Sequence, residues 1–157
     1  MTAAELVSAV VDPEMPMLTL ADLGVIRDVR EDDSGVVVTI TPTYSGCPAM
    51  DEIRADLRRA LAGYPHVEVR TVLAPAWTTD WISAAGKAKL AAAGIAPPGP
   101  APRGPVPLRL GPPRTDVGCP LCGHPQSELI SAFGATACRQ LRRCPSCREP
   151  FEHVKEI

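Results

Sequence analysis

Two pairs of cysteines, 119-CPLC-122 and 144-CPSC-147, constrain the fold of this chain more than any other feature of its sequence. Each pair has the CxxC spacing of a zinc knuckle, and the distance between the pairs is that of a four-cysteine zinc site. Four thiolates close a tetrahedral, structural site with no open position on the metal. We therefore expect one structural Zn²⁺ ion, while the pattern leaves iron open as the alternative metal. The expected ligands are Cys119, Cys122, Cys144 and Cys147.

The segment that carries these cysteines, residues 114–157, is too short to be stable on a hydrophobic core alone. Bound metal contributes folding free energy directly, so the zinc ion supplies what the core lacks. The stretches Glu128–Ser131 and Phe151–Val154 predict the short strands of a zinc ribbon. Cys138 is compatible with a substitute ligand, a free thiol or a buried filler, and we expect an unliganded thiol on the ribbon's loop.

A stretch rich in proline and glycine, residues 97–113, predicts a semi-rigid extended linker rather than a folded segment. It separates an N-terminal domain, residues 1–96, from the zinc ribbon, residues 114–157. The first domain has 8 basic against 13 acidic residues and the second has 6 against 5. Neither domain has the clustered positive charge that binding to nucleic-acid phosphates requires.

The first residues of the chain include acids and lack the basic segment of a secretory signal. No apolar run approaches the roughly 18 residues that a membrane span requires. Six cysteines in a protein that is not exported indicate metal or redox chemistry in a reducing compartment, rather than disulfide bonds. We expect a cytoplasmic protein without a membrane or nucleic-acid partner.

The N-terminal domain alternates helical and strand patterns. Val25–Arg30 and Val36–Thr41 flank a turn signal, so they predict an antiparallel hairpin. After a helical stretch, His66–Leu73 alternates like a third strand, and a right-handed crossover places it parallel to the second.

Two further helical patterns complete this domain. One covers Ala3–Val11, and the other runs to Ala93 from a cap at Thr79 or Asp80. The expected fold class is α+β: an α-β-β-α-β-α domain with a mixed three-stranded sheet, followed by a four-cysteine zinc ribbon.

The loop 41-TPTYSGCP-48 joins the second strand to the central helix. Proline is favoured at the first helical position, so Pro48 is expected to begin the helix and Cys47 to lie at its cap. Helix N–H groups that point at a sulfur lower its pKa and prepare it for metal or nucleophilic chemistry. A half-buried structural cysteine is the alternative. The loop is expected at the carboxyl end of the second strand, where open α/β sheets bind ligands.

The turn Asp12–Pro16 cannot be helical, because each proline forces its predecessor into extended geometry. Its two acids form either a binding site or only a helix stop. Both tryptophans, Trp77 and Trp81, lie in one segment. They either pack the third helix onto the sheet or form a rim beside the Cys47 loop for a partner or cluster.

Seven blocks of the sequence together resemble the PaaD family, the accessory proteins of the bacterial phenylacetyl-CoA epoxidase system. The first domain alone is similar to the wider family of Fe–S maturation and targeting domains, typified by SufT. In that family the DPE turn and the cysteine loop mark the functional edge. The resemblance thus implies a site at Asp12, Glu14 and Cys47, with Thr43 and Ser45 in the same loop. The seven blocks are 12-DPEMPMLTLADLGVIRDV-29, 38-VTITPTYSGCPAM-50, 75-PAWTTDWIS-83, 94-GIAPP-98, 119-CPLCG-123, 131-SAFGATAC-138 and 144-CPSCREPF-151.

The resemblance implies an accessory, non-catalytic role in aerobic phenylacetate breakdown. The chain lacks a dinucleotide fingerprint, a phosphate loop and a di-iron motif. The implied role is to install or repair the Fe–S cluster of the [2Fe–2S] reductase, with a labile cluster or iron at Cys47. One cysteine cannot hold a cluster that takes four ligands, so a homodimer or a partner supplies the remainder. The oxygenase and reductase components are the expected partners.

Three alternatives remain at this point. A scaffold would bind the oxygenase components without Fe–S chemistry. An enzyme with a cysteine nucleophile needs a base, and His66 is the one histidine of the first domain. The third alternative is a zinc ribbon that binds nucleic acid, and only the arginines near the second knuckle support it. Those arginines are Arg139, Arg142, Arg143 and Arg148.

Overall fold

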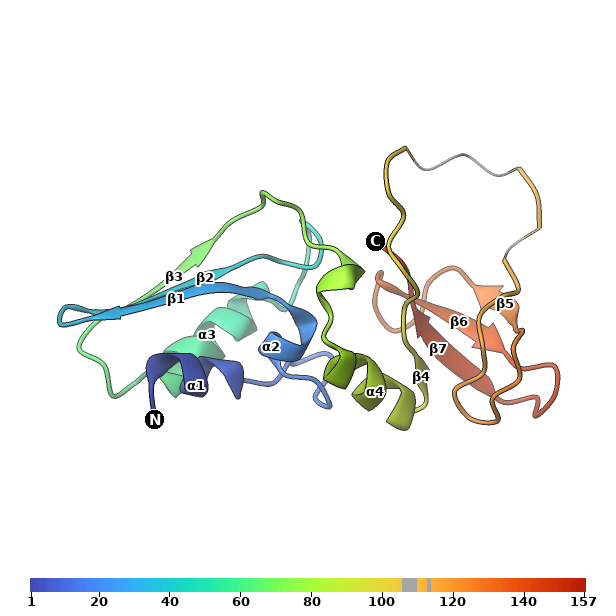
Figure 1. Cartoon of the computed structure of the whole chain (residues 1–157), viewed down its shortest axis with the longest axis horizontal. Coiled ribbons are helices and arrows are strands. Elements are labelled where there is room, and N and C mark those ends of the chain that lie inside the picture. The colour runs from blue at the N-terminus through green and yellow to red at the C-terminus, as the bar shows by residue number, and fades with distance from the viewer. Residues whose placement is uncertain (106–109, 113) are drawn as a thin grey trace. The chain divides into compact units, whose positions relative to one another are not determined.

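The computed structural model describes residues 1–105, 110–112 and 114–157 of the chain. The chain divides into two compact units, Met1–Gly86 and Lys87–Ile157 (Figure 1). None of the helices in these residues has the length and apolar character that crossing a membrane requires.

The N-terminal unit is built on a three-stranded sheet with the order β1-β2-β3. β1 (Ile26–Asp32) pairs antiparallel with β2 (Gly35–Ile40), and β3 (Val67–Thr71) pairs parallel with β2. The predicted hairpin and the predicted parallel return are therefore confirmed. The mixed sheet and the four-cysteine ribbon confirm the predicted fold class.

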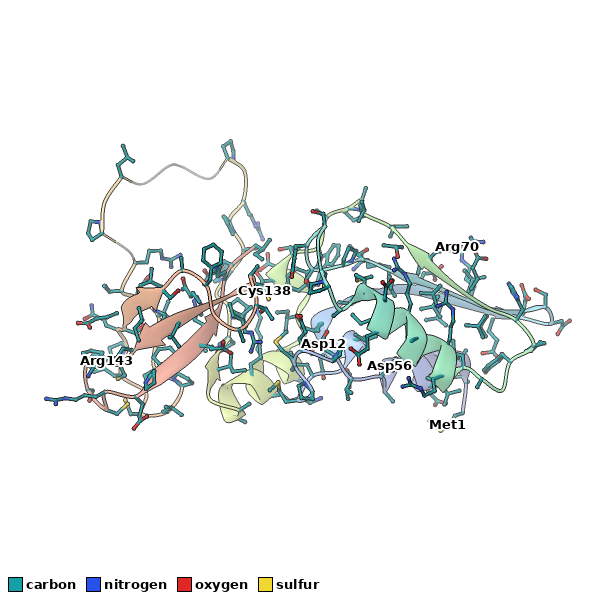
Figure 2. All side chains as sticks on the ribbon, turned by 180° about the vertical axis from the view of Figure 1, so that it is seen from behind. Met1, Asp12, Asp56, Arg70, Cys138 and Arg143 are labelled. Atoms are coloured by element: carbon teal, nitrogen blue, oxygen red, sulfur yellow. The ribbon has the colours of Figure 1, made fainter. Side chains whose placement is uncertain are left out.

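One face of this sheet is covered by α1 (Ala3–Ser8) and α3 (Met50–Ala60), which contact each other and the strands. Alternation along β2 buries Val36, Val38 and Ile40, each at most 1% exposed. The apolar stripe of α3 is buried in the same way and includes Ile53 and Leu57. The buried side chains of β2, at every second residue, and the apolar stripe of α3 thus pack into one aliphatic core (Figure 2).

A short helix that the periodicity did not predict, α2 (Leu20–Leu23), precedes β1. Thr19 and Asp22 form a capping box, in which each side chain accepts a hydrogen bond from the other residue's backbone N–H. The helix ends at Gly24, whose φ of 69° lies in the left-handed region. A four-residue helix is too short to show an apolar period, so only its caps could have indicated it.

The single helix expected to run to Ala93 is divided in two. A 3₁₀ turn, η1 (Thr79–Trp81), is capped by Thr78, and α4 (Ala84–Ala92) follows after extended Ile82. The expected cap at Thr79 or Asp80 was therefore wrong. Ser83 begins the second piece, because its Oγ accepts the N–H of Gly86 at 2.9 Å.

The C-terminal unit holds a four-stranded sheet with the order β4-β7-β6-β5. The predicted strands are confirmed as β5 (Glu128–Ser131) and β7 (Pro150–Val154). The sequence did not indicate β6 (Arg139–Arg143), which lies between them. Three arginines in five residues do not match a strand's composition, so the pairing partners decide its conformation.

The fourth strand, β4 (Ile95–Ala96), pairs parallel with β7 and joins the ribbon's sheet. The sequence places the end of the first domain at residue 96, whereas the compact units meet between Gly86 and Lys87. The start of the proline-rich stretch is held against the ribbon: Pro98 is buried, and the Gly99 N–H donates to Glu156 at 3.0 Å. Positions 106–109 and 113 of the expected linker lie outside the described residues.

Gly24→Ala is expected to destabilise the N-terminal unit strongly. A Cβ there would lie 2.6 Å from the Trp81 carbonyl oxygen. The left-handed backbone alone costs a non-glycine residue about 1–2 kcal/mol, so we expect a total loss of about 2 kcal/mol or more. Urea unfolding followed by tryptophan fluorescence measures this, because both tryptophans belong to this unit.

The matched control is Gly63→Ala, where an added Cβ meets nothing within 4 Å. Its unfolding midpoint should stay close to wild type, within about 0.5 kcal/mol. Equal losses in the two variants would contradict the assigned role of Gly24.

Candidate functional site

Three segments of the N-terminal unit leave the sheet at the same end. Ile40, the last residue of β2, pairs with Ile26 at the start of β1 and with Thr71 at the end of β3. The Thr41 N–H donates to the Val25 carbonyl, and the Val72 N–H donates to the Ile40 carbonyl, both at 2.9 Å. The Cys47 loop therefore begins at the carboxyl end of β2, as the sequence predicted.

The two tryptophans close this end of the sheet. The Nε1–H of Trp77 donates to the Leu23 carbonyl at 2.8 Å, and the ring is buried. The Arg27 guanidinium lies over the half-buried Trp81 ring, 3.7 Å from its centroid. Both rings thus pack around the junction of α2 and β1, which favours packing over a rim for a partner.

Cys47 lies in a tight turn and is half-buried. Its N–H donates to the Tyr44 carbonyl at 3.2 Å, and its carbonyl accepts the Met50 N–H at 3.4 Å. The helix begins at Met50 with Ala49 as N-cap, and no side chain makes a cap hydrogen bond. The expectation that Pro48 opens the helix was therefore wrong, because the turn displaces the start by two residues. Cys47 precedes the N-cap rather than occupying it.

Of the other predicted residues, Thr43 is half-buried and Ser45 is exposed on the same loop. Asp12 is 7% exposed, and its Oδ1 accepts the N–H groups of Glu14 at 2.9 Å and Met15 at 2.8 Å. These hydrogen bonds shape the turn that precedes α2, which is what a helix stop requires. A role for Asp12 and Glu14 at the Cys47 loop stays a prediction.

A residue that the sequence did not single out, Thr41, lies where this loop begins. It is 1% exposed, and its Oγ1 has no hydrogen-bond partner among the described residues. A buried hydroxyl without a partner costs about 1–3 kcal/mol. The sequence feature that could have indicated Thr41 is its position directly after β2, two residues before Thr43 in the same loop.

The ribbon's four cysteines form the second candidate site. Their sulfur atoms all lie within 4.8 Å of one another. The Sγ atoms of Cys119 and Cys147 are 3.8 Å apart, and those of Cys122 and Cys144 are 3.5 Å apart. Tetrahedral zinc with Zn–S bonds of about 2.3 Å places its sulfurs about 3.8 Å apart. The geometry therefore fits the predicted structural zinc ion.

The two knuckles repeat the same backbone design. The N–H of Cys119 donates to the carbonyl five residues on at 2.8 Å, and its carbonyl accepts the Gly123 N–H at 3.0 Å. Cys144 repeats both bonds at 3.1 and 3.0 Å, with Arg148 in the place of the glycine. Gly123 has φ 78° and Arg148 φ 64°, so both occupy the left-handed region. Arg148 therefore carries backbone strain that Gly123 avoids.

The sulfurs need a cation to be thiolates together. Burial raises the pKa of the Cys144 thiol, but the N–H groups of Cys147 and Ser146, together with contacts to neighbouring sulfurs, outweigh it and lower that pKa to about 6. The Glu149 N–H lowers the pKa of Cys147, yet burial and the neighbouring sulfurs raise it to about 12. Thiolates this close repel one another, and a divalent cation removes the repulsion.

Cys138 lies outside this group, which among the described residues contains only the four cysteines. Its Sγ is 3.0 Å from Thr136 Oγ1, in the turn before β6. The Nδ1 of His124 is 3.3 Å from the Gln126 N and so also serves its own turn. The position of Cys138 outside the four-sulfur group agrees with an unliganded thiol on the ribbon's loop.

Comparisons with known proteins match a known domain to each part of the chain. Residues 4–74 match the family model for an iron-sulfur cluster assembly protein, and residues 104–155 match the PaaD zinc beta ribbon domain. A protein of Escherichia coli K12, named as the D subunit of a 1,2-phenylacetyl-CoA epoxidase, is 43% identical over 154 residues. The alignment covers 97% of this chain and 90% of that protein. The chain belongs to the family of phenylacetyl-CoA epoxidase D subunits.

The N-terminal part of this D-subunit family member has further relatives. The Fe-S protein maturation auxiliary factor YitW of Bacillus subtilis is 39% identical over 85 residues, which cover 52% of this chain and 82% of YitW. A solved DUF59 domain from Bacillus anthracis superposes with a TM-score of 0.53 at 30% identity. The superposition covers 56% of this chain and 87% of that domain. The chain thus joins a DUF59-type fold to a zinc ribbon.

Replacing one zinc ligand should unfold the ribbon of this D-subunit family member. Cys144→Ala leaves three sulfurs, and the folding free energy of the metal is lost with the ion. We expect wild type to hold one zinc per chain and the variant close to none, by metal analysis. Cys138→Ala is the matched control and should keep its zinc. Equal zinc contents in the two variants would contradict the assigned ligand set.

Substitutions at Gly123 and Arg148, the two left-handed positions of the knuckles, are expected to change the zinc affinity differently. Gly123→Ala adds a strain of about 1–2 kcal/mol, and about 1.4 kcal/mol corresponds to a tenfold change in an equilibrium constant. Its apparent zinc affinity in a chelator competition should therefore fall about tenfold. Arg148→Gly removes the same strain and should leave the affinity unchanged or raise it. A tenfold loss in Arg148→Gly would show that its side chain outweighs the backbone.

Proposed function

We propose that this chain is a non-catalytic accessory protein of the phenylacetyl-CoA epoxidase system in the cytoplasm. Its N-terminal unit would mature or repair the Fe–S cluster of the reductase component, with Cys47 as a labile ligand for iron or a cluster. The observation that carries this proposal is the match of residues 4–74, Cys47 included, to an iron-sulfur cluster assembly protein. It occurs within a chain related over nearly its whole length to a D subunit.

The placement of Cys47 supports transfer rather than storage. The thiol is half-buried in a loop that follows the carboxyl end of β2. A cluster normally takes four protein ligands, so one thiol leaves positions for the thiols of a partner or of a second copy. A cluster that is incompletely ligated at Cys47 is more readily released to a recipient protein that offers all four ligands.

The position of His66 argues against the hypothesis that the chain is an enzyme with Cys47 as nucleophile. His66 precedes β3, and its carbonyl accepts the Val36 N–H near the start of β2 at 2.9 Å. Because β2 and β3 are parallel, His66 and the Cys47 loop lie at opposite ends of these strands. The histidine of this unit is thus poorly placed to activate the thiol, which a nucleophilic mechanism requires.

Cys47→Ala should fold normally and leave the reductase short of its cluster. Iron and acid-labile sulfide per reductase polypeptide are measured after co-expression with wild type or variant in cells that lack the native D subunit. We expect a loss of several-fold with Cys47→Ala. Cys138→Ala, which removes a half-buried thiol outside the proposed zinc ligands, is the matched control and should give full occupancy.

Full cluster occupancy with Cys47→Ala would overturn the maturation role. The scaffold alternative would then remain. It predicts that zinc-ligand variants such as Cys144→Ala lose the oxygenase components in a pull-down, while Cys47→Ala keeps them.

A further inference from the structure

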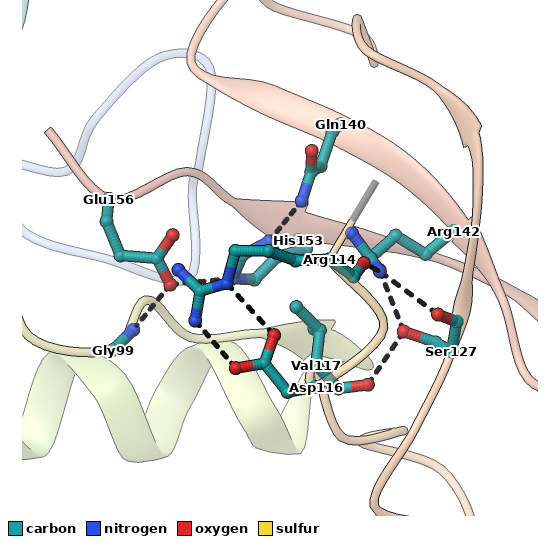
Figure 3. A network of polar contacts seen from close by, with 9 residues as sticks. All are labelled: Gly99, Arg114, Asp116, Val117, Ser127, Gln140, Arg142, His153 and Glu156. Atoms are coloured by element: carbon teal, nitrogen blue, oxygen red, sulfur yellow. Dashed lines mark hydrogen bonds and ion pairs between the residues drawn. The ribbon is translucent and has the colours of Figure 1, made fainter. Parts of the chain in front are cut away.

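The C-terminal unit contains a cavity of about 210 Å³ that neither the metal site nor the Cys47 loop uses. Its charged lining comprises three cations, Arg114, Arg142 and Lys155, against one carboxylate, Glu156. Gln140 and His153 add polar side chains (Figure 3). We refer to it as the Arg142 cavity, because Arg142 is its least usual member.

Arg142 is a buried cation held by uncharged partners. Its side chain comes from β6, an inner strand of the sheet, and the residue is 2% exposed. Its Nε donates to Ser127 Oγ at 2.7 Å, and its Nη2 donates to the carbonyls of Ser127, at 3.0 Å, and Arg114. Its Nη1 has no hydrogen-bond partner among the described residues (Figure 3). Buried charges are usually paired, whereas the three hydrogen bonds that Nε and Nη2 donate all go to uncharged oxygens.

The nearby carboxylates are engaged elsewhere. Asp116 forms an ion pair with Arg114 at 2.8 Å. Glu156 lies 3.4 Å from His153 Nε2 and accepts the Gly99 N–H at 3.0 Å. The His153 contact, opposed by burial and reinforced by Gly99, lowers the pKa of Glu156 to about 2. No ion pair to Arg142 forms within the described part of the chain.

Hydrogen bonding fixes the histidine in the cavity as well. Gln140 Nε2 lies 2.6 Å from His153 Nδ1, and an amide nitrogen can only donate. Nδ1 is therefore the acceptor, and the ring proton of neutral His153 lies on Nε2, facing Glu156. Among the described residues, Arg142 forms no hydrogen bond to Glu156 or His153, and its Nη1 stays without a partner.

We propose that the Arg142 cavity binds a phosphate group, either as free phosphate or as part of a phosphate monoester. The anion would accept from Arg142 Nη1 and balance the cationic lining. Hydrogen bonds to charged groups contribute about 1.5–3 kcal/mol, and guanidinium is the side chain best suited to phosphate.

A second hollow of about 510 Å³ adjoins the cavity and shares Arg114, Val117, His153 and Glu156 with it. Its other lining includes the apolar proline segment, residues 97–100, together with Asp116 and Cys119. This adjoining space is suited to the substituent of a monoester. The proposal therefore gives the anchored start of the proline-rich stretch a binding role, independent of the Fe–S proposal.

Titration of the zinc-loaded full chain with inorganic phosphate and with adenosine 5′-monophosphate tests this. Amide shifts in two-dimensional NMR are followed at constant ionic strength, with sodium chloride as the reference. We expect saturable shifts at Ser127, Gln140 and Val117 with both ligands. Tighter binding of the nucleotide would show that the adjoining space takes the substituent, and equal binding would assign free phosphate as the ligand.

Arg142→Gln should weaken both affinities at least tenfold, because a charged hydrogen bond is worth that much. Arg143→Gln is the matched control, since Arg143 is the exposed next residue outside the cavity lining. It should bind like wild type. If Arg142→Gln does not retain zinc, the location of the wild-type shifts decides. No saturation with either ligand, shifts confined to other residues, or equal binding by a folded Arg142→Gln would overturn the proposal.

Discussion

The closure of four sulfurs around one point is the constraint on which the C-terminal unit depends. The buried core beside this site consists of Ala96, Cys119, Cys144 and Phe151, so two of its four members are metal ligands. Burying so few apolar side chains cannot offset the conformational entropy of ordering this unit. Metal binding must therefore contribute the larger part of its folding free energy. The four strands and the proline segment take their places around a centre that the ion holds.

The N-terminal unit uses the opposite strategy. Its core is aliphatic and continuous between β2 and the α3 stripe, and it needs no metal to close. The segments at one end of the sheet are held by specific contacts, such as the Trp77 hydrogen bond to Leu23. The Cys47 loop is thus supported by a rigid base while its thiol stays half-exposed. For the proposed role of Cys47, this combination suits a ligand that must bind and release its cargo.

The features that were predictable from sequence are those with a strong local cause. The metal ligands follow from CxxC spacing, and β2 follows from its run of β-branched residues. β6 was not predictable, because Arg142 is buried by hydrogen bonds to Ser127 and Arg114, which are distant in sequence. The start of α3 was misplaced because Pro48 satisfies the rule for a first helical residue, while the turn at Cys47 overrides it. For Asp12, the structure shows the local role, because its Oδ1 accepts the N–H groups that shape the turn, and its role at the Cys47 loop stays a prediction.

The four ribbon cysteines and Cys47, the proposed labile ligand, are suited to different kinds of metal binding. A tetrahedral ion with four thiolates has no open coordination position, so exchange requires a knuckle to open. Opening would remove the ribbon's own folding free energy, which makes this site a poor donor of metal. Cys47 carries no such penalty, since the aliphatic core of its unit does not depend on its sulfur. Any iron that the chain passes to another protein is therefore better held at Cys47, and the ribbon's site is better left permanently filled.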